Sequence, residues 1–445
     1  MAQFARAMER APAQRFPPQI KFLAWNEAAE RYSYYGMTSI LTLHMAKNLG
    51  IAENRAEAFF HVFTFAAYFM PIVGAWIADR FWGRYRTVLW LSFGYVAGHA
   101  TLAAWESSTG LVVGLALIAV GAGGIKPCAS AFAGDQIPPG NEVLLARLYN
   151  LYYWMINLGS TLSTLTIPLL LDHVGPRAAF GAPGLAMAAA LAVFWAGRRL
   201  YLRVPPARAE RREAPERPVA PAPAGRAAGD LPAVLRIAAV FAPVAVFWAL
   251  FFQYGSSWTL QADKMDRAVL GHVISTGQMQ TMDALLVLTL IPLFAVVLYP
   301  ALERRGVRVT ALRKMAAGMF VTTLSFVAAA LVQSRLEAGQ APHVAWQVPQ
   351  YLFLVVGEVL VSVTALEFAY AQAPARLKSL VMGLWFVTIA SGSLLTAAVA
   401  WANRFQGVAY FAFFAALQLG AAVVFALVAW WYPVAPPARD AAELA

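Results

Sequence analysis

The 445-residue sequence contains few charged residues and a single cysteine. Asp, Glu, Lys and Arg together make up 13% of the residues, whereas 60% are hydrophobic. Because Cys128 is the only thiol, neither an intrachain disulfide framework nor a cysteine-based metal cluster can form. The mean hydropathy of +0.58 and the 14 tryptophans are typical of a chain whose natural solvent is lipid. The sequence therefore predicts an integral membrane protein.

Long apolar runs recur along the chain, and each is long enough to cross a hydrocarbon core of about 30 Å, which takes roughly 20 helical residues. Proline, alanine and arginine replace them from 204 to 232, which indicates a flexible cytosolic linker. We predict an all-α integral membrane protein with twelve transmembrane helices in two six-helix bundles, a layout in which two halves rock about a central site. Its parts are an N-terminal bundle (1–203), the linker (204–232), a C-terminal bundle (233–433) and a cytoplasmic tail (434–445).

The charge distribution predicts the orientation. Residues 1 to 20 carry three arginines and a proline pair in place of the apolar core of a cleavable signal peptide, so we expect the N-terminus to stay in the cytoplasm. Most Lys and Arg residues then fall in cytoplasmic loops, as the positive-inside rule requires. We predict a multi-pass protein of the cell inner (plasma) membrane with both termini cytoplasmic. The net charge of +11 is explained by contact with anionic lipid and needs no nucleic-acid partner.

Charged residues interrupt several of the predicted helices. Glu27, Glu30 and Arg31 stand at i, i+3 and i+4 and share one helix face, while Lys126 and Glu358 each lie deep in an apolar run. A charge at a helix centre costs about 3 kcal/mol, so the five would cost about 15 kcal/mol if they faced lipid unpaired. We expect them to line a wet, paired interior. For the first three, a solvated helix start with an intrahelical ion pair is an alternative of equal weight on spacing alone.

The run GAGG at 121–124 resembles a phosphate-binding loop only superficially. It lies inside an apolar helix and lacks both a preceding strand and the GxxxxGK[ST] spacing. Small residues at such positions favour close helix packing instead. We predict packing for this run and likewise for Cys128.

Four motifs, in order, resemble those of the proton-dependent oligopeptide transporter family of the major facilitator superfamily. They are EAAERYSYYG on the first helix, GAGGIKPCASAFAGDQ on the fourth, FWALFFQYGSSWTLQA on the seventh and GEVLVSVTALEFAYAQAP on the tenth. The segment GAWIADRFWGRYR also resembles the superfamily's loop between helices two and three. The resemblance covers both halves of the chain and implies a proton-coupled symporter that imports di- and tripeptides by alternating access. It implies no cofactor and no metal, and we expect a monomer.

The resemblance also implies roles for individual residues. Glu27, Glu30 and Arg31 would form the proton-coupling and carboxylate-binding group, with Lys126 as a further cation, and Glu358 would bind the peptide's amino terminus. Other positions would line the substrate cavity: Tyr34, Tyr35, Tyr68, Asn157, Trp248, Ser362 and Trp385. For these aromatic residues, a packing role is about equally plausible. A peptide with a carboxylate at one end and an ammonium at the other would bridge the two bundles.

The sequence departs from the family on the seventh and eighth helices. Phe252 stands where relatives have an acid, Ser257 where mammalian-like members have arginine, and Phe294-Ala295 where those have another acid. Asp283 occupies a position where relatives usually carry asparagine. We expect this acid either to pair with Arg31 or to accept the substrate ammonium beside Glu358. A helix-start carboxylate near the outer surface is the alternative.

The sequence leaves alternatives to peptide transport, and they differ in weight. A membrane enzyme is disfavoured, because no nucleophile–base pair, metal-ligand cluster or nucleotide loop has usable spacing. A non-transporting peptide sensor and a transporter of another small zwitterion or anion would share the same fold, which does not fix the substrate.

Overall fold

The computed structural model describes residues 15–138, 140–206, 224–307, 309–372 and 377–432. Almost all of them are helical, and the only strands in these ranges form one two-residue hairpin. The elements are α2 (Ile20–Leu43), η1 (His44–Asn48), α3 (Glu53–Ile77), η2 (Ala78–Trp82), α4 (Gly83–Ala104), α5 (Ser108–Gly134), α6 (Glu142–His173), α7 (Pro176–Ala196), η3 (Gly197–Arg199), α9 (Ala224–Phe241), α10 (Val244–Phe251), η4 (Phe252–Gly255), α11 (Ser257–Asp263), β1 (Ala268–Val269), β2 (His272–Val273), η5 (Thr276–Gln280), α12 (Thr281–Leu293), η6 (Phe294–Leu298), α13 (Tyr299–Arg304), α14 (Ala311–Glu337), η7 (Val344–Gln347), α15 (Val348–Glu358), η8 (Val359–Val363), α16 (Thr364–Gln372), α17 (Lys378–Ala402) and α18 (Gly407–Trp431).

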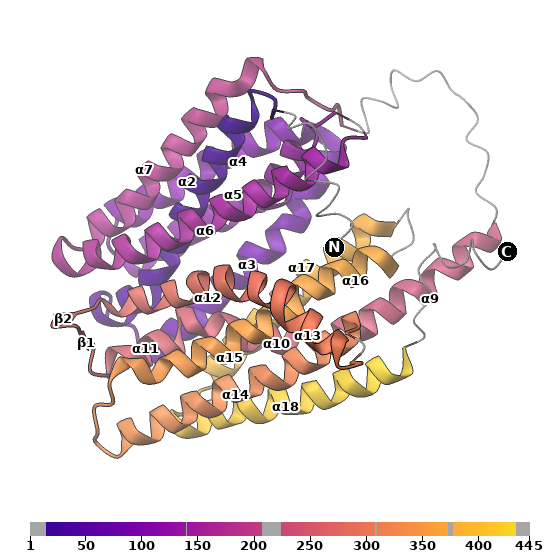
Figure 1. Ribbon diagram of the computed structural model, residues 1–445. Coiled ribbons are helices and arrows are strands. Elements are labelled where there is room, and N and C mark those ends of the chain that lie inside the picture. Colours follow the sequence, from indigo (N-terminus) through magenta and orange to yellow (C-terminus); the bar gives the residue numbers. More distant parts are fainter. Residues whose placement is uncertain (1–14, 139, 207–223, 308, 373–376, 433–445) are drawn as a thin grey trace. The chain divides into compact units, whose positions relative to one another are not determined.

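The chain divides into two compact units (Figure 1). Unit 1 contains residues 1–217 together with 254–285, and unit 2 contains 218–253 together with 286–445. Residues 254–285, which hold α11, the hairpin and the start of α12, therefore belong with the N-terminal helices. The boundaries predicted from the sequence place residues 254–285 within the C-terminal bundle (233–433). The bundle boundaries themselves stay a prediction.

Within the described ranges, ten helical segments are long and apolar enough to cross a membrane. One of them, residues 53–104, contains both α3 and α4, which are separated by η2 and by Gly83 at a φ of +73°. A positive φ favours glycine, because a side chain would strain the backbone there. The helix α2 is not among the ten, although it is 24 residues long, and it carries Glu27, Glu30 and Arg31. An all-helical, multi-pass membrane protein is thus confirmed.

The predicted linker differs from the structure at its end. Helix α9 begins at Ala224 and includes Pro232, so the last part of the 204–232 segment is helical. The alanines at 224, 227 and 228 favour helix, and they lie among the residues whose composition had indicated a flexible chain. Residues 207–223 of the predicted linker and the predicted tail at 434–445 lie outside the described residues.

Small residues bring the helices of unit 1 close together. Helix α5 packs on α3 and α4, and α2 packs on α6 and α7. A Cβ added to Gly74 of α3 would overlap the carbonyl oxygen of Gly123 in α5. That carbonyl receives no hydrogen bond from residue 127, because Pro127 has no N–H. The prediction that the glycine run packs helices is confirmed, and Cys128 is buried in an apolar cluster, as predicted.

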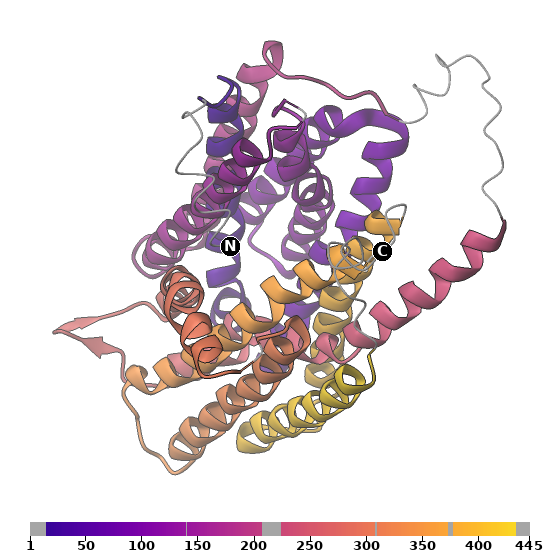
Figure 2. The same cartoon turned by 45° about the vertical axis from the view of Figure 1, so that its right-hand side comes forward.

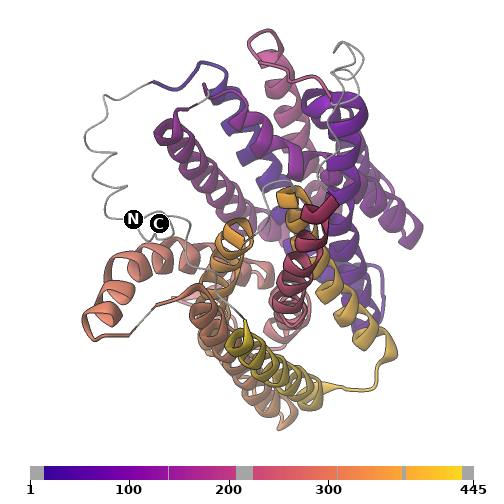
Figure 3. The same cartoon turned by 90° about the vertical axis from the view of Figure 1, so that its right-hand side faces the viewer.

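Unit 2 is built around two groups of packed helices. Helix α14 packs on α15 and α18, and α10 packs on α17. Figures 2 and 3 show α14 and α18 side by side, and they run in opposite directions, since Val408 at the start of α18 binds Glu337 at the end of α14. Residues of α12 with η6 and of α15 with η8 form one apolar cluster: Leu290, Phe294, Val355, Val359 and Leu360. Both η6 and η8 are π-helical turns, which widen a helix locally and often accompany functional positions.

The crossing of α3 and α5 generates a testable prediction. Replacing Gly74 with Ala should lower the stability of the detergent-solubilised protein by about 1–3 kcal/mol, because the added methyl group overlaps the Gly123 backbone. The measurement is a thermal unfolding curve. Gly94→Ala in α4 is the matched control, since its new Cβ would meet nothing closer than 3.9 Å. Equal melting of Gly74→Ala and wild type would contradict the close crossing.

Candidate functional site

Three charged side chains of α2 form a buried ionic group. Arg31 binds Glu30 through Nη2, and its Nε lies 3.4 Å from Oε1 of Glu27. The exposed fraction is 8% for Arg31, 6% for Glu27 and 0% for Glu30. These values contradict a solvated helix start, which was the alternative based on spacing. The group has the paired, buried form that charges within a membrane span require.

Close packing against α6 holds this group in place. A Cβ added to Gly159 of α6 would overlap the carbonyl oxygen of Ala28 and would lie 3.0 Å from Cβ of Arg31. The glycine therefore allows the two helix backbones to approach each other beside the ionic group. Asn157 lies two residues before Gly159 on α6, and its side-chain amide donates a hydrogen bond to the carbonyl of Tyr153 at 2.8 Å.

Lys126 meets two tyrosines from other helices. Its Nζ lies 4.0 Å from the ring centroid of Tyr34 in α2 and 4.0 Å from that of Tyr68 in α3. Arg31 also faces the Tyr34 ring, at 5.9 Å, and Tyr35 packs edge-on against it. Among the described residues, the buried Lys126 ammonium forms no hydrogen bond. Cation–π contacts stabilise it only in part, since each contributes about 0.5–2 kcal/mol.

Unit 2 holds the other predicted site residues. Trp248 and Trp385 meet edge-on with ring centroids 5.6 Å apart, and Phe252 stacks on Trp248. Glu358 is the last residue of α15, and Ser362 lies in the π-helical turn η8 that follows it. The family resemblance implies an acid at position 252. Phe252 instead packs its ring on Trp248 at this position.

Asp283 lies in the first turn of α12, directly after η5, and belongs to unit 1. Its Oδ1 is buried and has no hydrogen-bond partner among the described residues. The ion pairs of Arg31 in the same part of the chain are those with Glu27 and Glu30. A pair between Arg31 and Asp283 is therefore not formed in this structure.

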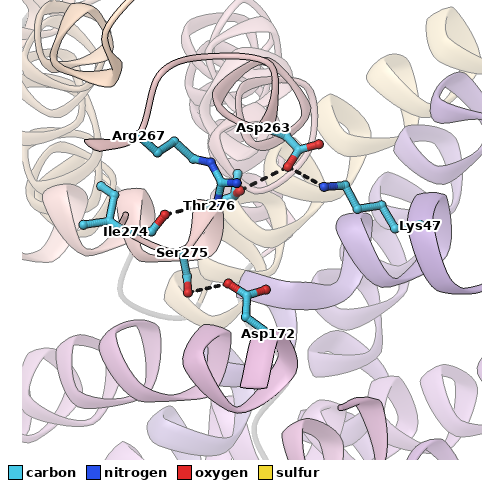
Figure 4. A network of polar contacts seen from close by, with 7 residues as sticks. All are labelled: Lys47, Asp172, Asp263, Arg267, Ile274, Ser275 and Thr276. Atoms are coloured by element: carbon cyan, nitrogen blue, oxygen red, sulfur yellow. Dashed lines mark hydrogen bonds and ion pairs between the residues drawn. The ribbon is translucent and has the colours of Figure 1, made fainter. Parts of the chain in front are cut away.

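A polar network ties residues 254–285 to the N-terminal helices (Figure 4). Lys47 donates to Asp263 at 2.6 Å, and Ser275 donates to Asp172 at 2.6 Å. Lys264 binds Glu53 at 2.7 Å. Deeper in the unit, Thr42 donates to the carbonyl of Gly255, and Gln280 donates to the carbonyl of Ser39. We call the three outer links, Lys47–Asp263, Glu53–Lys264 and Asp172–Ser275, the strap.

Sequence reasoning missed two buried histidines. Nε2 of His61 in α3 lies 2.9 Å from Oγ of Ser256, and Nε2 of His99 in α4 lies 2.9 Å from Oγ of Ser33. Both histidines are 0% exposed. An imidazole inside an apolar span is a polar group that needs a partner, so both were detectable from the sequence. Their serine partners were not, because they lie far away along the chain.

Comparison with known proteins gives these features a context. The sequence profile of the POT family matches residues 85–213 and 226–405. The chain is similar to peptide transporter family 1 of Drosophila melanogaster, with 38% identity over 364 residues that cover 74% of this chain and 49% of that protein. It is also similar to solute carrier family 15 member 2 of Mus musculus, with 37% identity over 389 residues that cover 78% of this chain and 53% of that protein. The chain thus spans about half the length of the curated relatives it matches.

A solved structure agrees with these relatives. An auto-inhibited POT family peptide transporter matches with a TM-score of 0.87 and 35% identity, over 95% of this chain and 99% of that one. The predicted resemblance is therefore confirmed from sequence and from fold. Because the family profile extends over most of the chain and the relatives agree with it, this chain belongs to the POT family.

Proposed function

We propose that the protein is a proton-coupled symporter that imports di- and tripeptides by alternating access. Relatives in two animals are named as a peptide transporter and a solute carrier, and the similar solved structure is of a peptide transporter. We propose transport rather than catalysis on the same ground. The site residues below are assigned as part of this proposal.

The buried ammonium of Lys126 is the observation that carries the proposal. It lies in electrostatic reach of Arg31, Glu27 and Glu30, and two tyrosine rings cover it, yet it has no hydrogen-bond acceptor among the described residues. A buried cation in this state is stabilised by an anionic ligand. The carboxylate of a peptide has the required charge and can accept hydrogen bonds from Lys126 and Arg31 together.

The ammonium end of the peptide needs an acid. We assign Glu358 to this role. Asp283 is a second candidate, because Oδ1 of Asp283 is buried without a hydrogen-bond partner among the described residues and Arg31 does not bind Asp283. The remaining proposed contacts to the substrate come from Tyr34, Tyr35, Tyr68, Asn157, Trp248, Ser362 and Trp385. Recognition of the two peptide ends by charge would leave the side chains in between free to vary.

The finer topology is part of the proposal. Counting α3 and α4 separately and adding α2 to the ten apolar segments gives the twelve transmembrane helices, in bundles 1–203 and 233–433 joined by the 204–232 segment. We propose a monomer in the plasma membrane, in contact with anionic lipid and with both termini in the cytoplasm. The strap then lies on the extracellular side and closes unit 1 toward the outside.

Glu27 and Glu30 are expected to bind the coupled proton. Replacing either residue with Gln should abolish uphill uptake driven by a proton gradient, while exchange of labelled for unlabelled dipeptide continues, because an amide cannot gain or lose a proton. Proteoliposomes with and without a pH gradient give both rates. Glu303→Gln, at an exposed position of α13, is the control and should behave as wild type. Continued accumulation by both site variants would refute the assignment.

Capped peptides test the polarity of binding. Charge-assisted hydrogen bonds contribute about 1.5–3 kcal/mol, so N-acetylation or C-terminal amidation of a dipeptide should each weaken binding roughly tenfold or more. Lys126→Gln should remove the discrimination against the amide only, and Glu358→Gln the discrimination against the acetyl group only. Competition against a labelled dipeptide measures both. If Asp283→Asn, and not Glu358→Gln, removes the acetyl penalty, then Asp283 is the ammonium acceptor.

The strap can be tested with a reporter thiol. In a Cys128→Ala background, Thr42→Cys places a thiol at a position that is 1% exposed. Asp263→Asn should speed its reaction with a membrane-impermeant maleimide added outside by up to roughly fivefold, because an exposed ion pair contributes about 0.2–1 kcal/mol. Arg177→Ala, which breaks the exposed pair with Glu106, is the control. Equal labelling rates in Asp263→Asn and the background would show that the strap does not control access.

A further inference from the structure

Two residues of α4, Tyr95 and His99, lie one helical turn apart on the side that faces α2. Both are 0% exposed, and their ring centroids are 5.3 Å apart. Helix packing fixes both rings. A Cβ added to Gly121 of α5 would lie 2.7 Å from Cβ of Tyr95, and one added to Gly184 of α7 would lie 2.9 Å from Cβ of His99.

A row of polar groups connects these rings to the ionic group. Ser33 lies one turn after Glu30 on α2, and its Oγ is 2.9 Å from Nε2 of His99. The Tyr95 hydroxyl faces the side chains of both Ser33 and Glu30. The groups therefore follow one another in the order Glu30, Tyr95, Ser33, His99, and every one of these residues is fully buried.

Several polar atoms in this row lack partners. The Tyr95 hydroxyl, Nδ1 of His99 and both carboxylate oxygens of Glu30 are buried and form no hydrogen bond of good geometry among the described residues, although Glu30 is ion-paired with Arg31. Unpaired buried polar groups are rare and need an explanation. Hydrogen bonds that can run in either direction, made directly or through an ordered water, would provide one.

We propose that Tyr95, Ser33 and His99 are positioning residues for Glu30, forming a hydrogen-bonded relay in which the Tyr95 hydroxyl changes partner when Glu30 binds a proton. In both states a neutral His99 donates to the backbone of Phe180, and its Nε2 accepts from the Ser33 hydroxyl. With Glu30 ionised, the Tyr95 hydroxyl donates to the carboxylate. With Glu30 protonated, the carboxyl O–H donates to Tyr95, and the Tyr95 hydroxyl turns to donate to Oγ of Ser33. Hydroxyl groups and a neutral imidazole can take either role. The inference rests on the proposed function, in that the proton bound by Glu30 is the coupled one.

The charged neighbours of Glu30 set the sign of the effect. Arg31 and Glu27 face it from α2, Tyr95 from α4 and Lys126 from α5. His99 is faced by Ser33, by Tyr95 and by the backbone of Phe180 in α7. A hydrogen bond donated to a carboxylate is stronger than one accepted from a neutral acid. Loss of the Tyr95 hydroxyl should therefore remove a stronger hydrogen bond from the ionised Glu30 than from the protonated one.

Infrared difference spectra of the full-length protein between low and high pH test this directly. The carbonyl band of protonated Glu30 is assigned by its loss in Glu30→Gln. In Tyr95→Phe, Ser33→Ala and His99→Leu, the band should change frequency, because each variant removes one hydrogen-bonding group of the relay. His99→Gln, which keeps a donor and an acceptor, should retain the wild-type frequency.

Ser92→Ala is the matched control, because Ser92 is a buried hydroxyl of the same helix that donates to its own backbone, at the Val88 carbonyl. It should leave the band unchanged. A wild-type spectrum without a Glu30 band, or equal band frequencies in wild type, Tyr95→Phe and Ser33→Ala, would overturn the relay. The spectra need no substrate. Shifted bands in a protein that fails to accumulate dipeptide would reject the proposed function and leave the relay intact, whereas normal accumulation with unshifted bands would reject the relay alone.

Discussion

The cost of burying charge in a membrane span governs the architecture of unit 1. Four charged residues, Glu27, Glu30, Arg31 and Lys126, lie in electrostatic reach of one another, and their formal charges sum to zero. Such a group is tolerated because each charge is offset locally. Adding one proton to an acid leaves an excess positive charge, which the carboxylate of a peptide would neutralise. Under the proposed function, coupling between proton and substrate would follow from this local charge balance without direct contact between them.

Glycine contacts make this charge balance geometrically possible. Apolar side chains gain little by leaving lipid, so helices in a membrane associate through close packing of small residues. Gly159 brings α6 against the turn of α2 that carries Arg31, and Gly74 brings α3 against the part of α5 next to Lys126. The Tyr68 ring therefore reaches the Lys126 ammonium from a different helix. The glycines act on the site indirectly, through the distance between helix backbones.

The sequence was informative where a signal is local. Apolar runs of the right length predicted the helices, the i, i+3, i+4 spacing predicted the paired face of α2, and the small residues at 121–124 predicted a close crossing. It was uninformative where the signal depends on distant residues. Ser33 meets His99 and Thr42 meets Gly255 across 66 and 213 positions, and a single sequence contains no record of such pairs. The sequence also did not predict that α9 begins at Ala224. The average composition of residues 204–232 indicated a flexible linker, although the alanines near its end favour helix.

The strap and the buried ionic group differ in the energy that each can supply. Three of the four side chains in the strap ion pairs are exposed, with Lys47 at 57%, Glu53 at 52% and Lys264 at 49%, whereas Asp263 is 17% exposed. Exposed pairs contribute about 1 kcal/mol or less. One proton crossing a potential of 100 mV releases about 2.3 kcal/mol. Breaking the two strap ion pairs is therefore within reach of the energy of a single proton, while buried hydrogen bonds of Thr42, His61 and Gln280 add to the hold on the same segment. A closure built from fully buried ion pairs, which cost about 3–5 kcal/mol to break, would exceed it. Under the proposed function, in which a carrier opens in every cycle, exposed pairs thus suit the outer part of this contact better than buried ones.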